Sequence, residues 1–151
     1  MWWSAMCGKT GLLLAFTGLL SCGTARIVSP DVLAQYTACD VDNISHWIGQ
    51  RIEYREQGPV WDSAAVCMAR GWGDCKCAAT VARDTLNMCA GYEARVVVLR
   101  GPRRALHAVA VFTDHKGRRG YINGIGRRLF DPGTAWQDVI QAIPGGPWTE
   151  L

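Results

Sequence analysis

The stretch Gly71-Trp72-Gly73-Asp74-Cys75-Lys76-Cys77-Ala78-Ala79 decides the fold, because it opens the helix around which the other segments are arranged. Small or apolar residues follow with the alternating four- and three-residue spacing of one helix face: Cys75, Ala79, Ala82, Leu86 and Cys89. Asp74 is a favourable N-cap, and Gly91 suits a position just past a helix end. The pattern therefore predicts a helix that begins near Cys75 and continues through Met88.

This placement puts Cys75 in the first turn of the helix. The unpaired N–H groups and the positive end of a helix favour a thiolate over a thiol, and the thiolate is the nucleophilic form. Gly71 and Gly73 allow a sharp backbone turn and the close approach of another molecule. Cys75 is therefore a candidate nucleophile, and the alternative is a small buried cysteine that opens an ordinary helix.

The N-terminus has the pattern of an export signal. Lys9 is followed by an apolar run, Gly11–Leu20, which is too short to span a bilayer comfortably. The run ends in Leu19-Leu20-Ser21-Cys22, which resembles a bacterial lipobox with Cys22 as the lipidated residue. Leu20 is not the most usual residue at its position, so an ordinary cleaved signal is an alternative, as are an uncleaved anchor and a buried apolar segment. We expect an exported protein on the periplasmic side of a bacterial membrane, anchored there by lipid.

Export would place the remaining cysteines in an oxidising compartment. Apart from Cys7 in the leader, Cys22 and Cys75, four cysteines remain: Cys39, Cys67, Cys77 and Cys89. Four cysteines allow two disulfides in three pairings. Cys77 and Cys89 lie on the same predicted helix, so an intact helix excludes a bond between them.

Length and composition indicate one ordinary globular domain. The chain has 151 residues, 49% apolar and 19% charged, with a formal net charge of +3. Residues 95–128 hold nine Arg or Lys and a single acid, Asp114. This basic stretch is either a solvated face or a surface for an anionic partner such as peptidoglycan, lipid head groups or an acidic peptide. Nothing in the sequence resembles a nucleic-acid-binding module.

Helical patterns dominate the first half of the chain. Ser29-Pro30-Asp31 is a helix-start signal, and the apolar residues after it support one long helix or two short ones through about Gln50. Asp62 or Ser63 would cap a short helix that ends near Arg70.

The second half is rich in β-branched residues and predicts three antiparallel strands. They are expected at residues 94–100, 106–113 and 119–125, with the last one continuing to Phe130 if a Gly-rich bend allows it. Thr134 and Gln137 resemble a capping box that opens a last helix. Helices first and a sheet second predict an α+β domain, with the Cys75 helix packed on the sheet. The expected organisation is a signal peptide, a tether, one domain and an irregular tail, over residues 1–22, 23–30, 31–143 and 144–151.

A cysteine nucleophile needs a base within reach and a third group that orients the base. Among the three histidines, His115 falls in a predicted turn, and His46 lies beside the apolar helix face as a surface or packed residue, whereas His107 opens an apolar strand. If the turn is centred near His115, residue numbers that face each other sum to about 230, which places Asn123 opposite His107 or within one residue of that position. The alternatives are that Asn123 is a turn residue, or that a shifted register substitutes Asp131.

These motifs, in this order, resemble the transglutaminase-like cysteine peptidase family of bacteria. The resemblance rests on Gly73-Asp74-Cys75, His107-Ala108-Val109 and Tyr121-Ile122-Asn123-Gly124, takes in the segment from Tyr54 to Trp61, and covers about residues 41–130. It implies a papain-like core and a thiol protease, a hydrolase of peptide or amide bonds in a peptide or protein substrate. It assigns Cys75 as nucleophile, His107 as base and Asn123 as the orienting group, with no cofactor.

Two departures from that family bear on function. Many members have acidic residues just after the cysteine, where some help to bind calcium, but here Lys76 and Cys77 follow it. We therefore expect no calcium dependence and no metal site. Asn123 stands where many members have Asp, and an amide oxygen can still orient a histidine. The Cys75 backbone N–H would be one oxyanion donor, and the sequence leaves three candidates for the second: Gln57, Trp61 and Trp72.

Two other kinds of protein fit parts of the sequence. A non-catalytic transglutaminase-like lipoprotein would use the fold as a binding module, with the cleft closed or Cys75 locked in a disulfide. A redox or metal protein would use the Cys75-Lys76-Cys77 pair, although no second pair of cysteines or histidines has ligand spacing. The state of the Cys75 thiol distinguishes all three.

Overall fold

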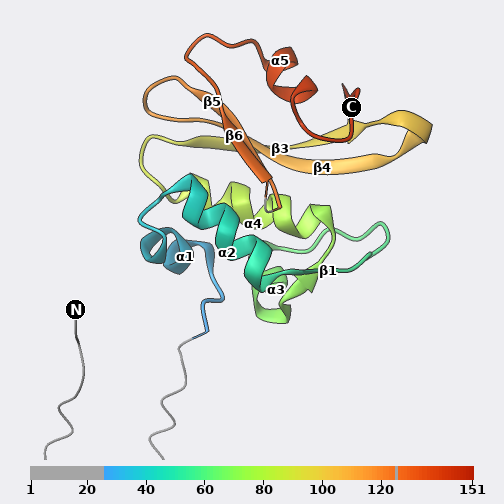
Figure 1. Ribbon diagram of the computed structural model, residues 1–151. Coiled ribbons are helices and arrows are strands. Elements are labelled where there is room, and N and C mark those ends of the chain that lie inside the picture. The colour runs from blue at the N-terminus through green and yellow to red at the C-terminus, as the bar shows by residue number, and fades with distance from the viewer. Residues whose placement is uncertain (1–25, 125) are drawn as a thin grey trace, which may run out of the picture.

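A computed structural model describes residues 26–124 and 126–151, arranged in helical layers around one sheet (Figure 1). The described helices are α1 Pro30–Tyr36, α2 Val41–Arg51, α3 Ala64–Arg70, α4 Cys75–Asn87 and α5 Trp136–Gln141. The described strands are β1 Glu53–Tyr54, β2 Trp72–Gly73, β3 Glu93–Arg100, β4 Leu106–Thr113, β5 Arg119–Asn123, β6 Gly126–Leu129 and β7 Thr149–Glu150. The expected α+β class is confirmed.

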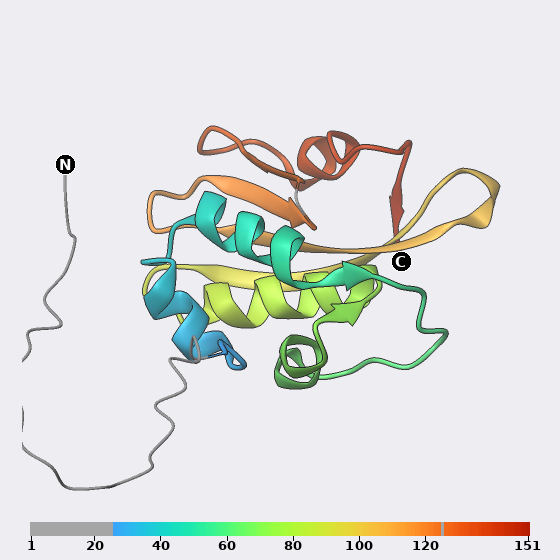
Figure 2. The ribbon, with the colours of Figure 1, turned by 60° about the horizontal axis from the view of Figure 1, so that its bottom comes forward.

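The main sheet is antiparallel and has the strand order β6-β5-β4-β3-β7. Helix α4 packs across β3 and β4 on one side, and α5 packs against β5 on the other. Figure 1 shows α2 and α4 on one side of the sheet and α5 on the other, and Figure 2 shows α2 and α4 running side by side. A separate two-stranded parallel pair, β1 with β2, leads the chain into α4.

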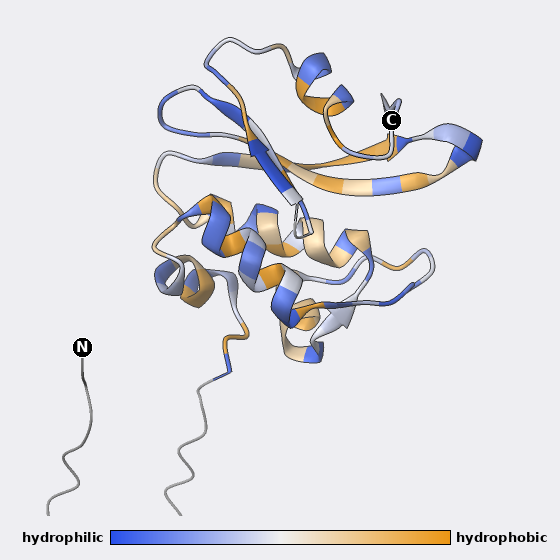
Figure 3. Cartoon of the chain, viewed as in Figure 1, coloured by the Kyte–Doolittle hydropathy of each residue, from blue (hydrophilic) through white to orange (hydrophobic). Residues whose placement is uncertain are grey.

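Two hydrophobic cores fill the two sides of the sheet. The core on the helical side includes Leu33, Ile44, Ile48, Val81, Leu86 and Phe112. The core on the other side joins the sheet to α5 and to the C-terminal segment through Val97, Leu99, Val109, Val111, Ile140 and Trp148. Figure 3 shows apolar segments, in orange, along the central strands β3 and β4. Because these strands contribute to both cores, both of their faces must be covered by other parts of the chain.

Local capping explains where the helices near the site begin and end. The Asp74 carboxylate accepts a hydrogen bond from the Lys76 N–H at the start of α4, as expected. Ser63 caps α3 in the same way, and Gly71 ends it in the left-handed conformation, with φ of 75°. Helix α4 is capped at its C-terminus by Met88, so Gly91 lies further on, in the turn before β3.

Two disulfides connect the helices. Cys39–Cys89 joins the loop before α2 to the end of α4, and Cys67–Cys77 joins α3 to the first turn of α4. This is one of the pairings that an intact α4 allows. Two disulfides fit an oxidising compartment.

The C-terminal third differs from expectation in three places. The expected third strand divides at Gly124 into a hairpin of β5 and β6. The Thr134–Gln137 capping box is wrong, because Thr134 donates its hydroxyl to the Asp131 carbonyl and Ala135 precedes α5 without a side-chain cap. The segment expected to be an irregular tail forms β7 and buries Trp148.

The leader, Cys22 and the start of the tether lie outside the described residues. Within residues 26–124 and 126–151, no helix has both the length and the apolar character needed to cross a membrane.

Candidate active site

Strand β2 and the residues after it hold the start of α4 in place. The Gly73 backbone passes so close to its neighbours that a Cβ there would lie 2.5 Å from the Cys77 sulfur and 3.0 Å from the Gln57 Oε1. Only glycine fits this passage without a shift. The same Gln57 oxygen accepts a hydrogen bond from the Asp74 N–H at 3.3 Å. The close passage at Gly73 and the hydrogen bond to the Asp74 N–H therefore both fix the direction in which α4 leaves the β1–β2 pair.

Cys75 is the free cysteine of the described chain and is half-buried. Its sulfur accepts a hydrogen bond from the backbone N–H of Ala108 on β4, at 3.4 Å. The side chain of His107, the residue before Ala108, lies beside the same sulfur and lines the same cavity. The helix N-terminus and the start of β4 thus meet at this thiol.

His107 and Asn123 are in direct contact. The His107 Nε2 lies 2.7 Å from the Asn123 Oδ1. Because an amide oxygen accepts only, Nε2 carries the proton in this contact, and Nδ1 is the ring nitrogen left for the Cys75 sulfur. The structure therefore brings together the three residues singled out in the sequence.

The register that achieves this differs from the expected one. The β4–β5 ladder pairs Ala110 with Ile122 and Val111 with Tyr121, so the residue numbers sum to 232 and not to 230. His107 and Asn123 are therefore diagonal neighbours on one face, still within reach of a histidine ring. The shift arises at the turn, where Asp114 accepts from the N–H groups of both Lys116 and Arg118.

The alternative orienting group is not at the site. Asp131 is exposed in the turn after β6, and Asn123 occupies the contact with His107. His46 and His115 are exposed, as the turn position predicted for His115. His107 is thus the histidine that lines the Cys75 cavity.

The electrostatics of the pair favour charge separation. Burial raises the pKa of the Cys75 thiol, but hydrogen bonds from His107 and from the Ala108 N–H outweigh this and bring the pKa below its ordinary value. The hydrogen bond to Cys75 raises the pKa of His107, burial opposes it, and the bond to Asn123 raises it further. Each partner stabilises the charged form of the other, as a thiolate and an imidazolium would.

Trp148 is a residue of the site that sequence reasoning missed. Its indole stacks on the His107 ring with centroids 5.6 Å apart and an interplanar angle of 27°. The indole Nε1 donates to the Ile143 carbonyl at 2.9 Å, and the Gln141 amide donates to the Trp148 carbonyl at 2.6 Å. A tryptophan in an otherwise polar, Gly- and Pro-rich tail was the available signal, because such a large apolar side chain needs a partner.

A cavity opens beside these residues. It has a volume of about 380 Å³ and is lined by Cys75, His107 and Asn123 together with mainly apolar groups from α2, β1 and α4, among them Ile48, Ile52, Tyr54 and Ala78. A substrate in this cavity would lie directly against the sulfur. A ligand could therefore enter the cavity beside Cys75, His107 and Asn123.

The candidates for a second oxyanion donor differ in how they are engaged. The Gln57 amide is committed on both atoms, because its Nε2 donates to Asp62 at 2.6 Å while its oxygen holds the Asp74 N–H. Trp72 lies under the Arg70 guanidinium, 3.9 Å from the ring centroid. Trp61 is half exposed, with 49% of its surface accessible. None of these three side chains donates a hydrogen bond to the Cys75 sulfur.

The Cys75-Lys76-Cys77 pair does not form a common site. Cys77 is buried and bonded to Cys67, whereas Cys75 is free. One cluster of possible metal ligands occurs among the described residues: Asp62, Cys67 and Cys77. Because two of its members form a disulfide and Asp62 is paired with Arg70 at 2.9 Å, this cluster is not a ligand set in the oxidised protein.

No model of a known protein family matches the chain, and no curated protein sequence does either. Solved structures do match. The calcium-bound LapG of Legionella pneumophila, a transglutaminase-like cysteine protease, aligns with a TM-score of 0.55 and 14% identity over 74% of this chain and 61% of LapG. The chain has a transglutaminase-like peptidase fold.

Two other solved structures align with parts of the chain. EGTA-treated LapG aligns with a TM-score of 0.50 and 15% identity over 60% of this chain and 54% of LapG. A proposed cysteine protease from Cytophaga hutchinsonii aligns with a TM-score of 0.49 and 16% identity over 84% of this chain and 50% of that protein. The alignments cover less than two thirds of each of these proteins, and at such identities the transglutaminase-like likeness concerns the fold.

Proposed function

We propose that the protein is an exported thiol hydrolase of peptide or amide bonds, a cysteine peptidase with a Cys-His-Asn triad. One observation carries the proposal: the free Cys75 at the start of α4 lines one cavity with His107, whose Nε2 contacts Asn123. The fold shared with LapG, described as a transglutaminase-like cysteine protease, supports a peptide or protein substrate.

The mechanism follows from these contacts. The Cys75 thiolate attacks the carbonyl carbon of the substrate, forming a C–S bond and placing the negative charge on the oxygen. The Cys75 backbone N–H, in the first turn of α4, is suited to stabilise that oxygen. The His107 imidazolium then gives the proton on Nδ1 to the leaving amine as the C–N bond breaks. Water, deprotonated by the same nitrogen, then attacks the carbonyl carbon of the thioester. The C–S bond breaks, the carboxylic acid leaves, and the Cys75–His107 pair keeps one proton as before.

The site needs no bound metal for these steps, and a cation already occupies the position after the nucleophile. The Lys76 ammonium forms an ion pair with Asp74 and donates to the Gly58 carbonyl at 2.9 Å. Because a positive charge stands where some family members have calcium-binding acids, we propose that activity is independent of calcium.

The location belongs to the same proposal. The signal pattern that ends at Cys22 supports export and lipid attachment at that residue, on the periplasmic side of a bacterial membrane. The two disulfides support an oxidising compartment. The binding-module alternative required a blocked Cys75 or a closed cleft, and it is not favoured by a free thiol that lines a cavity.

Selective labelling tests the triad directly. Iodoacetamide should alkylate Cys75 rapidly near neutral pH, and neither Cys75→Ala nor a disulfide cysteine should be labelled in the oxidised protein. Cys75→Ala and His107→Ala should each abolish thiol-dependent hydrolysis of peptide or glutamine-amide substrates while the folded spectrum is kept. A product in which the amine is exchanged would establish transfer in place of hydrolysis.

Equal rates in EGTA and in millimolar calcium chloride are expected in the same assay. Slow labelling of Cys75 in the folded protein, at the rate of a free cysteine in solution, would contradict the triad. A bridged Cys75 in peptide maps of the oxidised protein would favour the binding module.

A further inference from the structure

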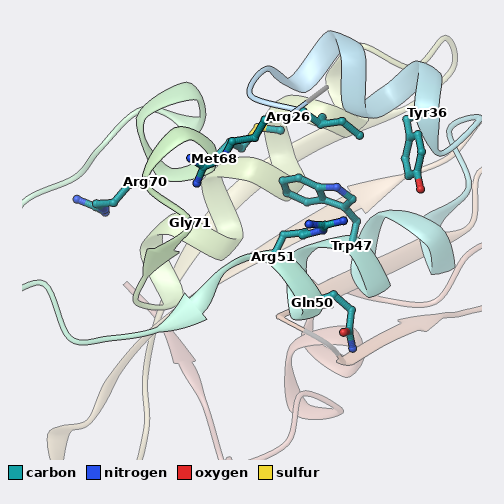
Figure 4. Close-up of a pocket in the computed structure, with 9 residues that line it drawn as sticks. Arg26, Tyr36, Trp47, Gln50, Arg51, Met68, Arg70 and Gly71 are labelled. Atoms are coloured by element: carbon teal, nitrogen blue, oxygen red, sulfur yellow. The ribbon is translucent and has the colours of Figure 1, made fainter. Parts of the chain in front are cut away.

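A second hollow lies on the side of α2 that faces α1 and α3. It has a volume of about 660 Å³, and its lining includes Arg26, Tyr36, Trp47, Gln50 and Arg51 (Figure 4). None of its nine lining residues is acidic. An anion would therefore meet guanidinium, amide, indole and phenol groups and no carboxylate.

Two of the arginines at this hollow are unused. Within the described part of the chain, neither Arg26 nor Arg51 has a carboxylate partner, and both are exposed. Arg70, the third arginine of the lining, is paired with Asp62 and points away from the other side chains in Figure 4. The available positive charge of the hollow is thus that of Arg26 and Arg51.

The basic stretch seen in the sequence is, by contrast, partly neutralised. Ion pairs join Arg95 to Glu150, Arg118 to Asp114 and Arg127 to Asp42. Charge near the C-terminal half is therefore less available to an anionic partner than the composition indicated.

Exposed apolar groups lie on and just before α1, the helix whose Tyr36 also lines the hollow. Val32 and Tyr36 lie four residues apart on α1 and share one face, and Val28 precedes the helix. Their exposed fractions are 44%, 71% and 42%. Tyrosine and tryptophan are enriched where a membrane meets water, and arginine binds phosphate with two parallel hydrogen bonds. We call this combination the N-terminal face: Arg26, Val28, Val32, Tyr36, Trp47 and Arg51.

We propose that the N-terminal face binds the phosphate headgroup of an anionic phospholipid, with Arg26 and Arg51 on the phosphate and Val28, Val32 and Tyr36 at the lipid surface. The orientation rests on the proposed lipid anchor, because Cys22 and Arg26 are four residues apart. Even a fully extended chain of that length reaches only about 14 Å. A lipidated Cys22 would therefore hold this face close to the bilayer.

Helix α2 keeps this surface apart from the candidate active site. Trp47, Gln50 and Arg51 line the hollow, whereas Ile48 and Ile52 line the cavity that contains Cys75. In helical spacing Trp47 and Gln50 lie on a different side of α2 from Ile48. A bound headgroup would leave the Cys75 cavity open to a substrate that approaches from the aqueous side.

Vesicle binding by a chain that begins at Gly23 and carries no lipid tests the proposal. Both hydrophobic cores are built from residues 27–148, so this chain keeps the whole fold. It should bind vesicles of phosphatidylglycerol and phosphatidylcholine at low salt, and not vesicles of phosphatidylcholine alone. The double variant Arg26→Gln/Arg51→Gln should bind about thirtyfold more weakly, because an arginine near an anionic surface contributes about fivefold each.

The matched control is Arg103→Gln/Arg104→Gln. It removes the same charge from two exposed arginines in the turn between β3 and β4 and should change binding less than threefold. Equal losses in both double variants, or no loss in Arg26→Gln/Arg51→Gln, would overturn the proposal. So would titration of inorganic phosphate that saturates the site in a chain with no affinity for the vesicles.

The headgroup site and the peptidase activity can each be rejected independently of the other. Hydrolysis by Arg26→Gln/Arg51→Gln should equal that of the unaltered chain, since neither arginine contacts the Cys75 cavity. Binding that follows Arg26 and Arg51 in a chain lacking hydrolytic activity would support the headgroup site and reject the peptidase.

Discussion

Asn123 affects the charge of His107 as well as its orientation. Its Oδ1 accepts from Nε2, and the bond to Asn123 is one of the causes that raise the pKa of His107. A higher histidine pKa in turn favours the Cys75 thiolate, whose pKa the imidazole lowers. Both shifts favour the thiolate–imidazolium pair that the proposed mechanism uses, in the pH window between the pKa of Cys75 and that of His107.

The pH profile of hydrolysis should report this window. The rate should rise with pH as Cys75 ionises, below the ordinary pKa of a thiol, and fall at higher pH as His107 loses its proton, above the ordinary pKa of histidine. Asn123→Ala should narrow the window from both sides, because it removes a bond that stabilises the imidazolium. It should also lower kcat/KM by about 10- to 100-fold, part of what general acid–base catalysis provides.

Asn123→Asp is the matched variant for that profile. It keeps an oxygen at the same place and adds negative charge, so the limb at high pH should move further up. A profile of kcat/KM that is the same in Asn123→Ala as in the unaltered protein would show that Asn123 does not act on His107.

At the scale of elements, the C-terminal segment closes the site from the side of the sheet opposite α4. Strand β7 pairs with β3, and the Leu151 N–H donates to the Val98 carbonyl at 3.0 Å. Trp148, 8% exposed, is held between this strand and α5 and stacks on His107. The segment thus limits the access of water to the His107–Asn123 hydrogen bond, which strengthens that bond.

Replacing Trp148 should therefore affect stability and catalysis together. Trp148→Ala should lower the free energy of unfolding by about 3–5 kcal/mol, as expected for loss of a large buried aromatic side chain. Trp148→Phe keeps an aromatic ring against His107 and loses the Nε1 bond to Ile143, so its cost should be smaller. Urea unfolding gives the stability, and kcat/KM measured well below the transition gives the effect on the site.

The same two Trp148 variants can also contradict this prediction. If Trp148→Ala unfolds at the same urea concentration as the unaltered protein, the segment is not part of the core. If both variants lose stability but keep the pH profile of hydrolysis, Trp148 supports the fold without influencing His107.

The elements that local chemistry specifies were predictable from the sequence. Ser63 and Gly71 mark the two ends of α3, and Asp74 marks the start of α4. These ends could be predicted because each residue acts on backbone groups only a few residues away. The β4–β5 register was not predictable in the same way. The Asp114 carboxylate enlarges the turn by accepting from two backbone N–H groups, a contact that strand periodicity does not encode.

The candidate site shows the same division. His107 and Asn123 could be paired from the sequence because an error of two in the summed residue numbers keeps both side chains on one face of the sheet. Trp148 could not be placed, because its partners lie on β4 and after α5, and only tertiary packing brings them together. The pairing of Cys67 with Cys77 likewise depends on how α3 lies against α4.

At the scale of the whole molecule, α2 separates two surfaces with different chemistry. One is the mainly apolar cavity at Cys75, and the other is the N-terminal face with Arg26 and Arg51. In the proposed arrangement the anchor at Cys22 and the N-terminal face act at the same membrane. The anchor would supply most of the affinity, since each buried CH₂ of an acyl chain contributes about 0.8 kcal/mol, and the arginines would set the orientation.

The anchor can be tested apart from the face because the two respond differently to salt. In a bacterial host, the unaltered protein should stay with the membrane fraction in high salt, since burial of acyl chains is not screened. Cys22→Ala should release the protein into the soluble fraction, or leave a larger precursor whose leader is still attached, and mass spectrometry tells these outcomes apart. Any residual binding of the released form should disappear in high salt, because it would depend on Arg26 and Arg51. An unmodified N-terminus upstream of Cys22 in the unaltered protein would show that no lipid is attached there.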